Sequence, residues 1–228
     1  MSKILAIDTS HSHCSVALNT GGKIDSLITT EPRAHARRLL PMIEELMERN
    51  SISLSELDAI AFVNGPGSFT GLRIGAGVAQ GLALGAQVPV LGLSSMAVMA
   101  LKAAGSTQGK ELLICMQARE NEVYSATYLP QGDDVQLLGQ ERVGGIDSID
   151  FTVLTQPQDA YLVGDGLDLA LQAISERGEV QIQVYRDACV SDAHTLSVLA
   201  ATRFAGGESV EPALALPVYL KEQMDYQE

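Results

Sequence analysis

The chain of 228 residues has few of the residues that mark several specialised protein classes. Its three cysteines, Cys14, Cys115 and Cys189, are far apart and form no CxxC pair. The sequence therefore predicts reduced, buried thiols and neither a disulfide framework nor a cysteine zinc site. Tryptophan is absent and aromatic residues make up only 4%, although 46% of the residues are hydrophobic. This composition is typical of an aliphatic α/β core.

Basic residues are also scarce. Lys and Arg number 15 against 28 Asp and Glu, which gives a net charge of −13. The second half carries the excess, because residues 1–110 have a net charge of +1 and residues 111–228 of −14. A protein that binds nucleic acid by itself usually has a basic face. We therefore expect any contact with RNA to be indirect.

Long apolar segments are missing as well. No apolar run approaches the roughly 20 residues that a membrane-spanning helix needs. The N-terminal "MSKILAID" lacks the charged start and long apolar centre of a signal peptide. We expect a cytoplasmic protein without membrane contact.

Apolar periodicity predicts two α/β lobes, residues 1–108 and a smaller lobe at 109–228. We expect strands at 3–8, 14–19, 23–30, 59–63, 88–93, 111–117 and 122–129, and a strand followed by a turn at 160–166. We expect helices at 34–50, 70–86, 94–105, 167–178 and 192–207. "NTGG" is typical of a hairpin turn between the second and third strands. Pro41 predicts a kink or restart in the first helix, and Thr70 is the expected N-cap of the second.

The segment "NGPGSFTGLRIGAGVAQGLALG", Asn64 to Gly85, has seven glycines in 22 residues. It is not a Walker loop, because it contains no lysine. It also fails the GxGxxG pattern, since Gly65 and Gly67 fit but Thr70 stands where the third glycine belongs. An anion at the helix N-terminus is the lesser alternative to a structural strand-to-helix corner.

Within the helix, Gly77, Gly81 and Gly85 recur every four residues and share one face, and Gly71 and Gly75 form a second stripe. Each glycine inside a helix costs about 0.5–1 kcal/mol relative to alanine. Such a helix needs a compensating close contact. The contact is either the chain's own sheet or the helix of a partner, and apolar residues all round the helix favour the partner.

Several stretches together resemble the TsaB (YeaZ) family. They are "ILAIDTS…CSVAL", "NGPGSFTGLRIG…AQGLALG", "PVLGLSSM" and "PVYL", which cover most of residues 3–128 and return at 217–220. The resemblance implies a two-lobed, actin-like ATPase (ASKHA) fold related to the TsaD/glycoprotease family. It also implies a role beside TsaD in making N6-threonylcarbamoyladenosine (t6A) at position 37 of tRNAs that read ANN codons.

The resemblance implies that the chain has lost the catalytic metal site. Relatives of the TsaD type carry a His-x-x-x-His pair on the helix after the equivalent of "PVLGL". Ser95 and Met99 take those positions here, and neither is a good ligand for a hard metal ion. We therefore expect a non-catalytic subunit without a bound metal.

The resemblance further implies that the second helix and the "HARRLLPMIEELM" helix form a partner interface. The partner would be TsaD, with TsaE joining at the interface and TsaC supplying threonylcarbamoyl-AMP; alone, the chain would form a homodimer. ATP or ADP between subunits is the one candidate cofactor. The expected interface residues are His35, Leu39, Met42, Ile43, Met47, Leu72, Ile74, Gly77, Val78, Gly81, Leu82 and Gly85.

Two other functions stay open. One is a glycoprotease-like metallopeptidase, although the four histidines form no HExxH motif; His11 and His13 are two apart and could share a face. The other is a nucleotide-binding module. Its candidate residues are Asp8, Thr9 and Ser10, the turn Val163–Gly166, and Arg119 and Glu122 in a hairpin turn at the cleft between the lobes.

Overall fold

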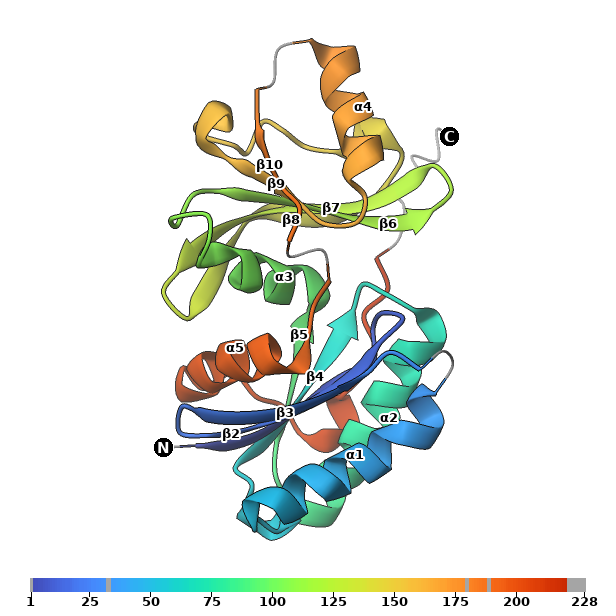
Figure 1. Ribbon diagram of the computed structural model, residues 1–228, viewed down its shortest axis with the longest axis vertical. Helices are drawn as coiled ribbons and strands as arrows, with labels where there is room; N and C mark the ends of the chain where they lie inside the picture. The colour runs from blue at the N-terminus through green and yellow to red at the C-terminus, as the bar shows by residue number, and fades with distance from the viewer. Residues whose placement is uncertain (1, 32–33, 179–180, 188–189, 221–228) are drawn as a thin grey trace. The chain divides into compact units, whose positions relative to one another are not determined.

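The computed structural model describes residues 2–31, 34–178, 181–187 and 190–220. These residues form two compact units, coloured along the chain in Figure 1. The first unit contains the described residues up to Val98 together with Ser191–Val218. The second contains Met99–Val190 and continues from Tyr219.

The first unit is built on a five-stranded sheet with the order β3-β2-β1-β4-β5. Its strands are β1 (Lys3–Asp8), β2 (Cys14–Thr20), β3 (Lys23–Thr29), β4 (Ala59–Gly65) and β5 (Val90–Ser94). β1 pairs antiparallel with β2 and parallel with β4. The predicted hairpin at "NTGG" is confirmed, because β2 and β3 pair up to Thr20 and Lys23, and Gly21 and Gly22 have positive φ.

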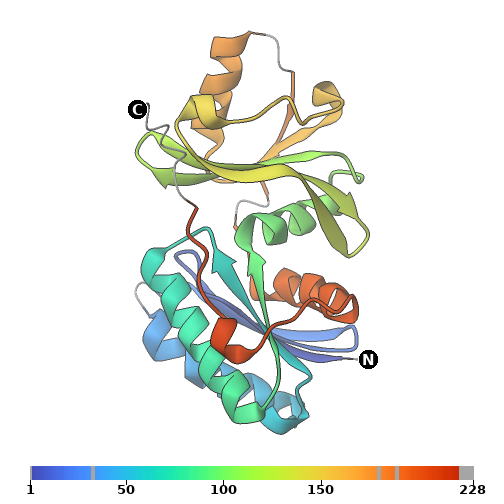
Figure 2. The ribbon, with the colours of Figure 1, turned by 180° about the vertical axis from the view of Figure 1, so that it is seen from behind.

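Helices cover both faces of this sheet. The helices α1 (His35–Asn50) and α2 (Phe69–Ala86) lie on one face, and α5 (Ala193–Ala205) lies on the other (Figures 1 and 2). This explains why β1 and β2 are buried along almost their whole length, since a strand covered on both sides needs apolar residues facing both ways. Leu39 and Leu46 of α1 and Leu196 and Leu199 of α5 are fully buried.

The predicted division at residue 108 differs from the structure. α5 and the chain up to Val218 belong to the first unit and not to a contiguous C-terminal lobe. The physical reason is that α1 and α2 cover only one face of the first sheet, and α5 supplies the apolar cover for the other. The segment after α5 also stays with this sheet, because Val210 forms a bridge with Val90 and the Val218 N–H donates to the Asn64 carbonyl at 2.7 Å.

The second unit has its own five-stranded sheet with the order β10-β9-β6-β7-β8. Its strands are β6 (Leu112–Arg119), β7 (Glu122–Gln131), β8 (Asp134–Gly144), β9 (Tyr161–Val163) and β10 (Gln183–Tyr185). The helix α4 (Leu167–Arg177) packs on it, and α3 (Ser95–Ala104) spans the division between the units. The predicted β6–β7 hairpin is confirmed, whereas β8 and β10 were not predicted.

Three local expectations have clear outcomes. Pro41 lies inside α1, which does not restart there. The N-cap of α2 is Ser68 and not Thr70, because the Ser68 hydroxyl accepts a hydrogen bond from the Gly71 N–H. Cys14 and Cys115 are free and buried, and Cys189 lies outside the described residues. Within the described part of the chain, no helix is long and apolar enough to cross a membrane.

Candidate partner-binding face

The inner glycines of α2 let the helix press against its own chain. A Cβ atom added to Gly67, just before the helix, would lie 2.5 Å from the Ser10 carbonyl oxygen. A Cβ on Gly71 would overlap the Thr9 carbonyl oxygen, and a Cβ on Gly75 would lie 2.5 Å from Thr9 Oγ1. Only glycine allows this approach. Packing within the unit therefore explains the glycines at these three positions.

Hydrogen bonds hold the start of α2 against the turn between β1 and β2. The Ser68 N–H donates to the Ser10 carbonyl at 2.7 Å, and Thr9 Oγ1 donates to the Gly71 carbonyl at 2.8 Å. The glycine-rich segment is therefore a turn between β4 and α2 that is hydrogen-bonded to the residues after β1.

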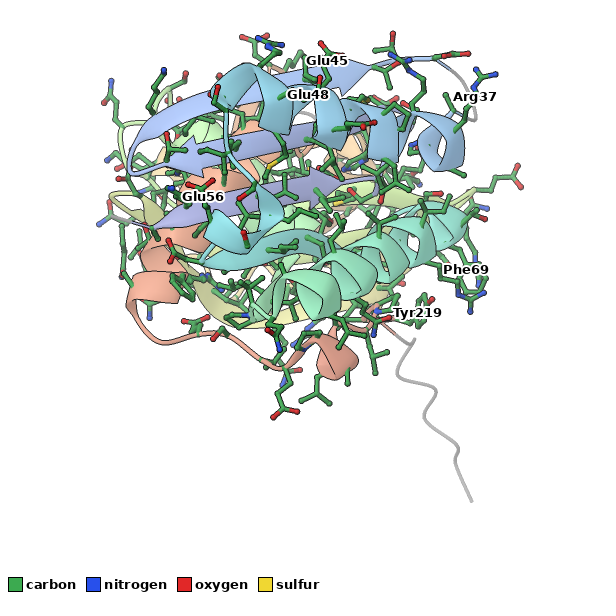
Figure 3. The ribbon with its side chains drawn as sticks, turned by 90° about the horizontal axis from the view of Figure 1, so that it is seen from below. Arg37, Glu45, Glu48, Glu56, Phe69 and Tyr219 are labelled. Atoms are coloured by element: carbon green, nitrogen blue, oxygen red, sulfur yellow. The ribbon has the colours of Figure 1, made fainter. Side chains whose placement is uncertain are left out.

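The outer glycines of α2 have a different environment. A Cβ atom on Gly77, Gly81 or Gly85 would meet nothing within 4 Å. Beside them, the side chain of Leu84 is 73% exposed, and on α1 that of Leu40 is 51% exposed. Figure 3 shows α1 and α2 side by side on this face of the unit. Along α2 this face presents glycines in place of larger side chains, and its exposed leucines make it partly apolar.

Three half-buried side chains of α2 lie between the buried and open faces. Ile74, Val78 and Leu82 pack at the edge of the core cluster that also contains residues of α1. At the start of α2, Phe69 is 55% exposed, and the Arg73 guanidinium lies 3.5 Å from its ring centroid. Ile74, Val78 and Leu82 therefore connect α2 to the core that α1 shares.

Part of the predicted interface is buried within the first unit. Five of the expected contact residues are at most 7% exposed in the core of their own unit: Leu39, Met42, Ile43, Met47 and Leu72. The apolar stripe of an amphipathic helix faces the sheet that it covers, so these side chains fasten α1 and α2 to the first sheet. The residues that remain available are the outer glycines and the half-buried side chains beside them.

His35 was expected in the partner interface, but its ring binds within the chain. Its Nε2 atom lies 2.9 Å from the His11 carbonyl oxygen and 3.1 Å from that of His13. The rings of His11 and His13 stack with centroids 5.8 Å apart, and His13 Nε2 contacts the Ser191 carbonyl at 2.9 Å. The histidines thus tie the β1–β2 turn to α1 and to the start of the α5 segment.

The candidate nucleotide residues Asp8, Thr9 and Ser10 are all buried. Asp8 Oδ1 accepts hydrogen bonds from the Ser10 N–H at 2.9 Å and from Ser10 Oγ at 2.6 Å. Asp8 Oδ2 accepts from Ser191 Oγ at 2.5 Å. Both carboxylate oxygens are therefore engaged by hydroxyl and amide groups of the chain. Sequence reasoning missed Ser191, because nothing in its local sequence links it to a strand end 183 residues away.

The other candidate nucleotide residues lie in the second unit. Arg119 and Glu122 flank the β6–β7 turn and form an ion pair of 3.7 Å, in which the Arg119 side chain is 81% exposed. Such an exposed pair contributes little to stability. In the turn Val163–Gly166, the Asp165 carboxylate accepts a hydrogen bond from the Gln117 N–H at 2.8 Å. This turn is fastened to β6.

The two positions aligned with the expected histidine pair are internal. Ser95 and Met99 are 0% exposed, and Ser95 Oγ donates to the Pro66 carbonyl at 2.6 Å. Among the residues that the structure describes, no group of three or more His, Cys, Asp or Glu side chains could hold a metal ion. The hydrogen bond from Ser95 therefore stabilises the turn between β4 and α2.

Comparisons with known proteins show which family the chain resembles. The family described as TsaD, tRNA N6-adenosine threonylcarbamoyltransferase, matches residues 28–195. The tRNA threonylcarbamoyladenosine biosynthesis protein TsaB of Escherichia coli K12 is 36% identical over an alignment of 227 residues, which covers 97% of this chain and 96% of the relative. The protein of the same name from Haemophilus influenzae is 46% identical over 121 residues, 53% of this chain and 51% of the relative.

Two solved structures from Pseudomonas aeruginosa are also similar. One, called YeaZ, has 38% identity and a TM-score of 0.85, over 96% of this chain and all of the other. The second, described as an uncharacterized protein with similarity to peptidase YEAZ, has 39% identity and a TM-score of 0.87, over 97% and 100%.

The matches define the class first: the chain has the TsaD-related α/β fold of the actin-like (ASKHA) type, as its sequence predicted. The relatives that match almost the whole chain identify the family more narrowly within that class. The chain belongs to the TsaB (YeaZ) family.

Proposed function

We propose that this chain is a non-catalytic scaffold and activator subunit that pairs with TsaD. The pair would transfer the threonylcarbamoyl group from threonylcarbamoyl-AMP to A37 of tRNAs that read ANN codons. Its bacterial relatives are described as t6A biosynthesis proteins. The absence of a histidine pair at Ser95 and Met99 supports a partner that supplies the catalytic site.

The outer glycines of α2 are the observation that carries this proposal. Gly77 and Gly81 each weaken an isolated helix by about 1 kcal/mol relative to alanine. No close contact within the described part of the unit requires glycine at either position, because a Cβ there would meet open space. A helix of a second protein that packs close to the backbone of α2 would account for these glycines.

Further parts of the proposal follow from the family. TsaE would join the pair, TsaC would supply threonylcarbamoyl-AMP, and a homodimer would form through the same face when TsaD is absent. ATP or ADP between the subunits belongs to the same proposal. Contact with tRNA would be indirect, which agrees with the net charge of −13.

The test is size-exclusion chromatography with light scattering on this chain mixed with TsaD. Gly81→Leu should abolish the complex and leave a folded chain, because leucine is the better helix former and finds open space in the free unit. Gly105→Leu is the matched control, since its Cβ also meets nothing within 4 Å and it lies beyond the end of α3. A complex that forms equally well with Gly81→Leu would overturn the proposed face.

A further inference from the structure

A pocket lies beside β5, which is an edge strand of the first sheet. The segment after α5 forms its other wall, and Figure 2 shows this segment passing β5 and reaching α2 through η4 (Pro212–Leu214). All the residues that line the pocket belong to the first unit. Its volume is about 520 Å³, and ligand sites typically have about 300–1,000 Å³. We name this feature the β5 pocket.

Apolar side chains form most of the β5 pocket. From the sheet, the lining includes the buried side chains of Phe62 and Leu93. From the segment after α5, it includes Leu214, Leu216 and Val218, which are 61%, 59% and 47% exposed. Large apolar side chains that gather around an open hollow are typical of a binding surface.

β5 brings an unpaired piece of backbone to this pocket. The Ile60 N–H of β4 donates to the Pro89 carbonyl at 3.1 Å, so every second residue from Pro89 onward pairs with β4. Val90 faces the other way, and its N–H and carbonyl both bond to Val210 at 2.9 Å. Gly92 has the same orientation as Val90, because orientation alternates along a strand. No described residue bonds to Gly92 on this outer side, so its N–H and carbonyl are available to another extended backbone.

The Asn64 side chain adds a second polar group to the pocket. Its Nδ2 atom lies over Gly92, where an added Cβ would be only 2.8 Å away. Glycine at position 92 therefore makes room for the amide. Within the described part of the chain, no group hydrogen-bonds the Asn64 amide. An amide has both donor and acceptor atoms, so it can bind a peptide unit that lies beside β5.

We propose that the β5 pocket binds an extended peptide segment of another protein, with an aliphatic side chain in the pocket and a lysine or arginine beside it. The peptide adds a strand at Gly92, in the way that the chain's own Val210 does at Val90. Among the described residues that line the pocket, only Glu208 is charged. Its carboxylate attracts the basic neighbour, because the Arg203 guanidinium, 3.8 Å away, is a weak partner for it.

An extended peptide fits this pocket better than a helix or an apolar small molecule. A helix uses its own backbone groups internally, and a hydrocarbon has no groups that could pair with Gly92. An extended peptide supplies a backbone N–H and carbonyl to the strand edge and side chains to the apolar walls. The inference goes beyond the proposed function and does not depend on pairing with TsaD.

The probe is a fluorescein-labelled pentapeptide, Lys-Leu-Val-Leu-Lys, whose binding to this chain is measured by fluorescence anisotropy. Two further peptides carry one N-methyl group, either on the central valine or on the leucine after it. Neighbouring N–H groups of a strand point to opposite sides, so only one of the two methyl groups blocks pairing with Gly92. We expect that peptide to bind about tenfold more weakly than the other, because it loses a hydrogen bond.

Protein variants locate the bound peptide. Leu216→Ser removes an apolar wall and should weaken binding of the parent peptide about tenfold. Leu137→Ser is the matched control, since Leu137 is an exposed leucine of β8 that does not line the pocket, and its effect should stay below about twofold. By nuclear magnetic resonance, hydrogen exchange at the Gly92 amide should slow about tenfold when the peptide is bound. Circular dichroism confirms that each variant is folded.

Several outcomes would overturn this inference. They are a parent peptide that fails to bind the wild-type chain, two N-methylated peptides of equal affinity, and binding that Leu216→Ser leaves unchanged. A dimer in light scattering that Leu216→Ser dissociates would assign the pocket to a second copy of this chain and exclude the peptide. None of these results bears on the pairing with TsaD, which Gly81→Leu tests separately.

Discussion

Alanine placed on the inner and on the outer stripe of α2 should have opposite effects on stability. The pair of variants is Gly71→Ala and Gly77→Ala, which make the same chemical change in the same helix. A Cβ on Gly71 would overlap the Thr9 carbonyl oxygen, whereas a Cβ on Gly77 would meet nothing within 4 Å. The two variants therefore separate internal packing from helix propensity.

The magnitudes follow from these surroundings. Gly77→Ala should raise the free energy of unfolding by about 1 kcal/mol, the difference in helix propensity between glycine and alanine. Gly71→Ala should lower it by about 2 kcal/mol, because the obstacle is a backbone oxygen that cannot rotate away and overpacking costs about 1–3 kcal/mol. In a chain of this length, a difference of about 3 kcal/mol separates the melting temperatures by about 6–12 °C.

Thermal and urea denaturation followed by circular dichroism measure both variants. We expect Gly77→Ala to melt above the wild-type protein and Gly71→Ala to melt below it. Two variants that are equally stable, or a Gly71→Ala variant that gains stability, would refute the assignment of the inner stripe to contact with Thr9.

Two further predictions concern ionisable groups. The Ser53 N–H and the Lys3 ammonium lower the pKa of Glu56 from 4.5 to about 2, so its contribution to stability is present above pH 4.5 and is lost as the pH falls through the folded value. The melting temperatures of wild type and Glu56→Gln should therefore converge near pH 2, and a constant difference would contradict this. Burial raises the pKa of Cys14 to about 11 and of Cys115 to about 12; peptide mapping should find neither alkylated by iodoacetamide at pH 8 unless urea is added.

The first sheet was readable from sequence because its signals are local. Alternating and continuous apolar residues mark β1, β2 and β4, and "NTGG" marks the β2–β3 hairpin. β8 was missed, because only Val135 and Gly144 of its residues are buried and its apolar pattern is weak, although it pairs with the preceding strand β7 in a short hairpin. Its pattern resembles that of a loop until the partner strand is known.

The two glycine stripes show where sequence reasoning ends. Gly71 and Gly75 follow the same spacing as Gly77 and Gly81, so periodicity treats both stripes alike. Only tertiary structure reveals that the first stripe meets Thr9 and that the second meets open space. α5 gives the same lesson, because its amphipathic pattern predicts a helix but cannot tell which of two sheets it covers.

The central claim is that the chain activates TsaD through the outer face of α2 without contributing a catalytic site. The most direct measurement is the t6A content of tRNA after incubation with TsaC, TsaD and TsaE, with and without this chain. We expect wild type and Gly105→Leu to restore t6A formation and Gly81→Leu to leave it at the level seen without the chain. Full t6A formation with folded Gly81→Leu would contradict the claim.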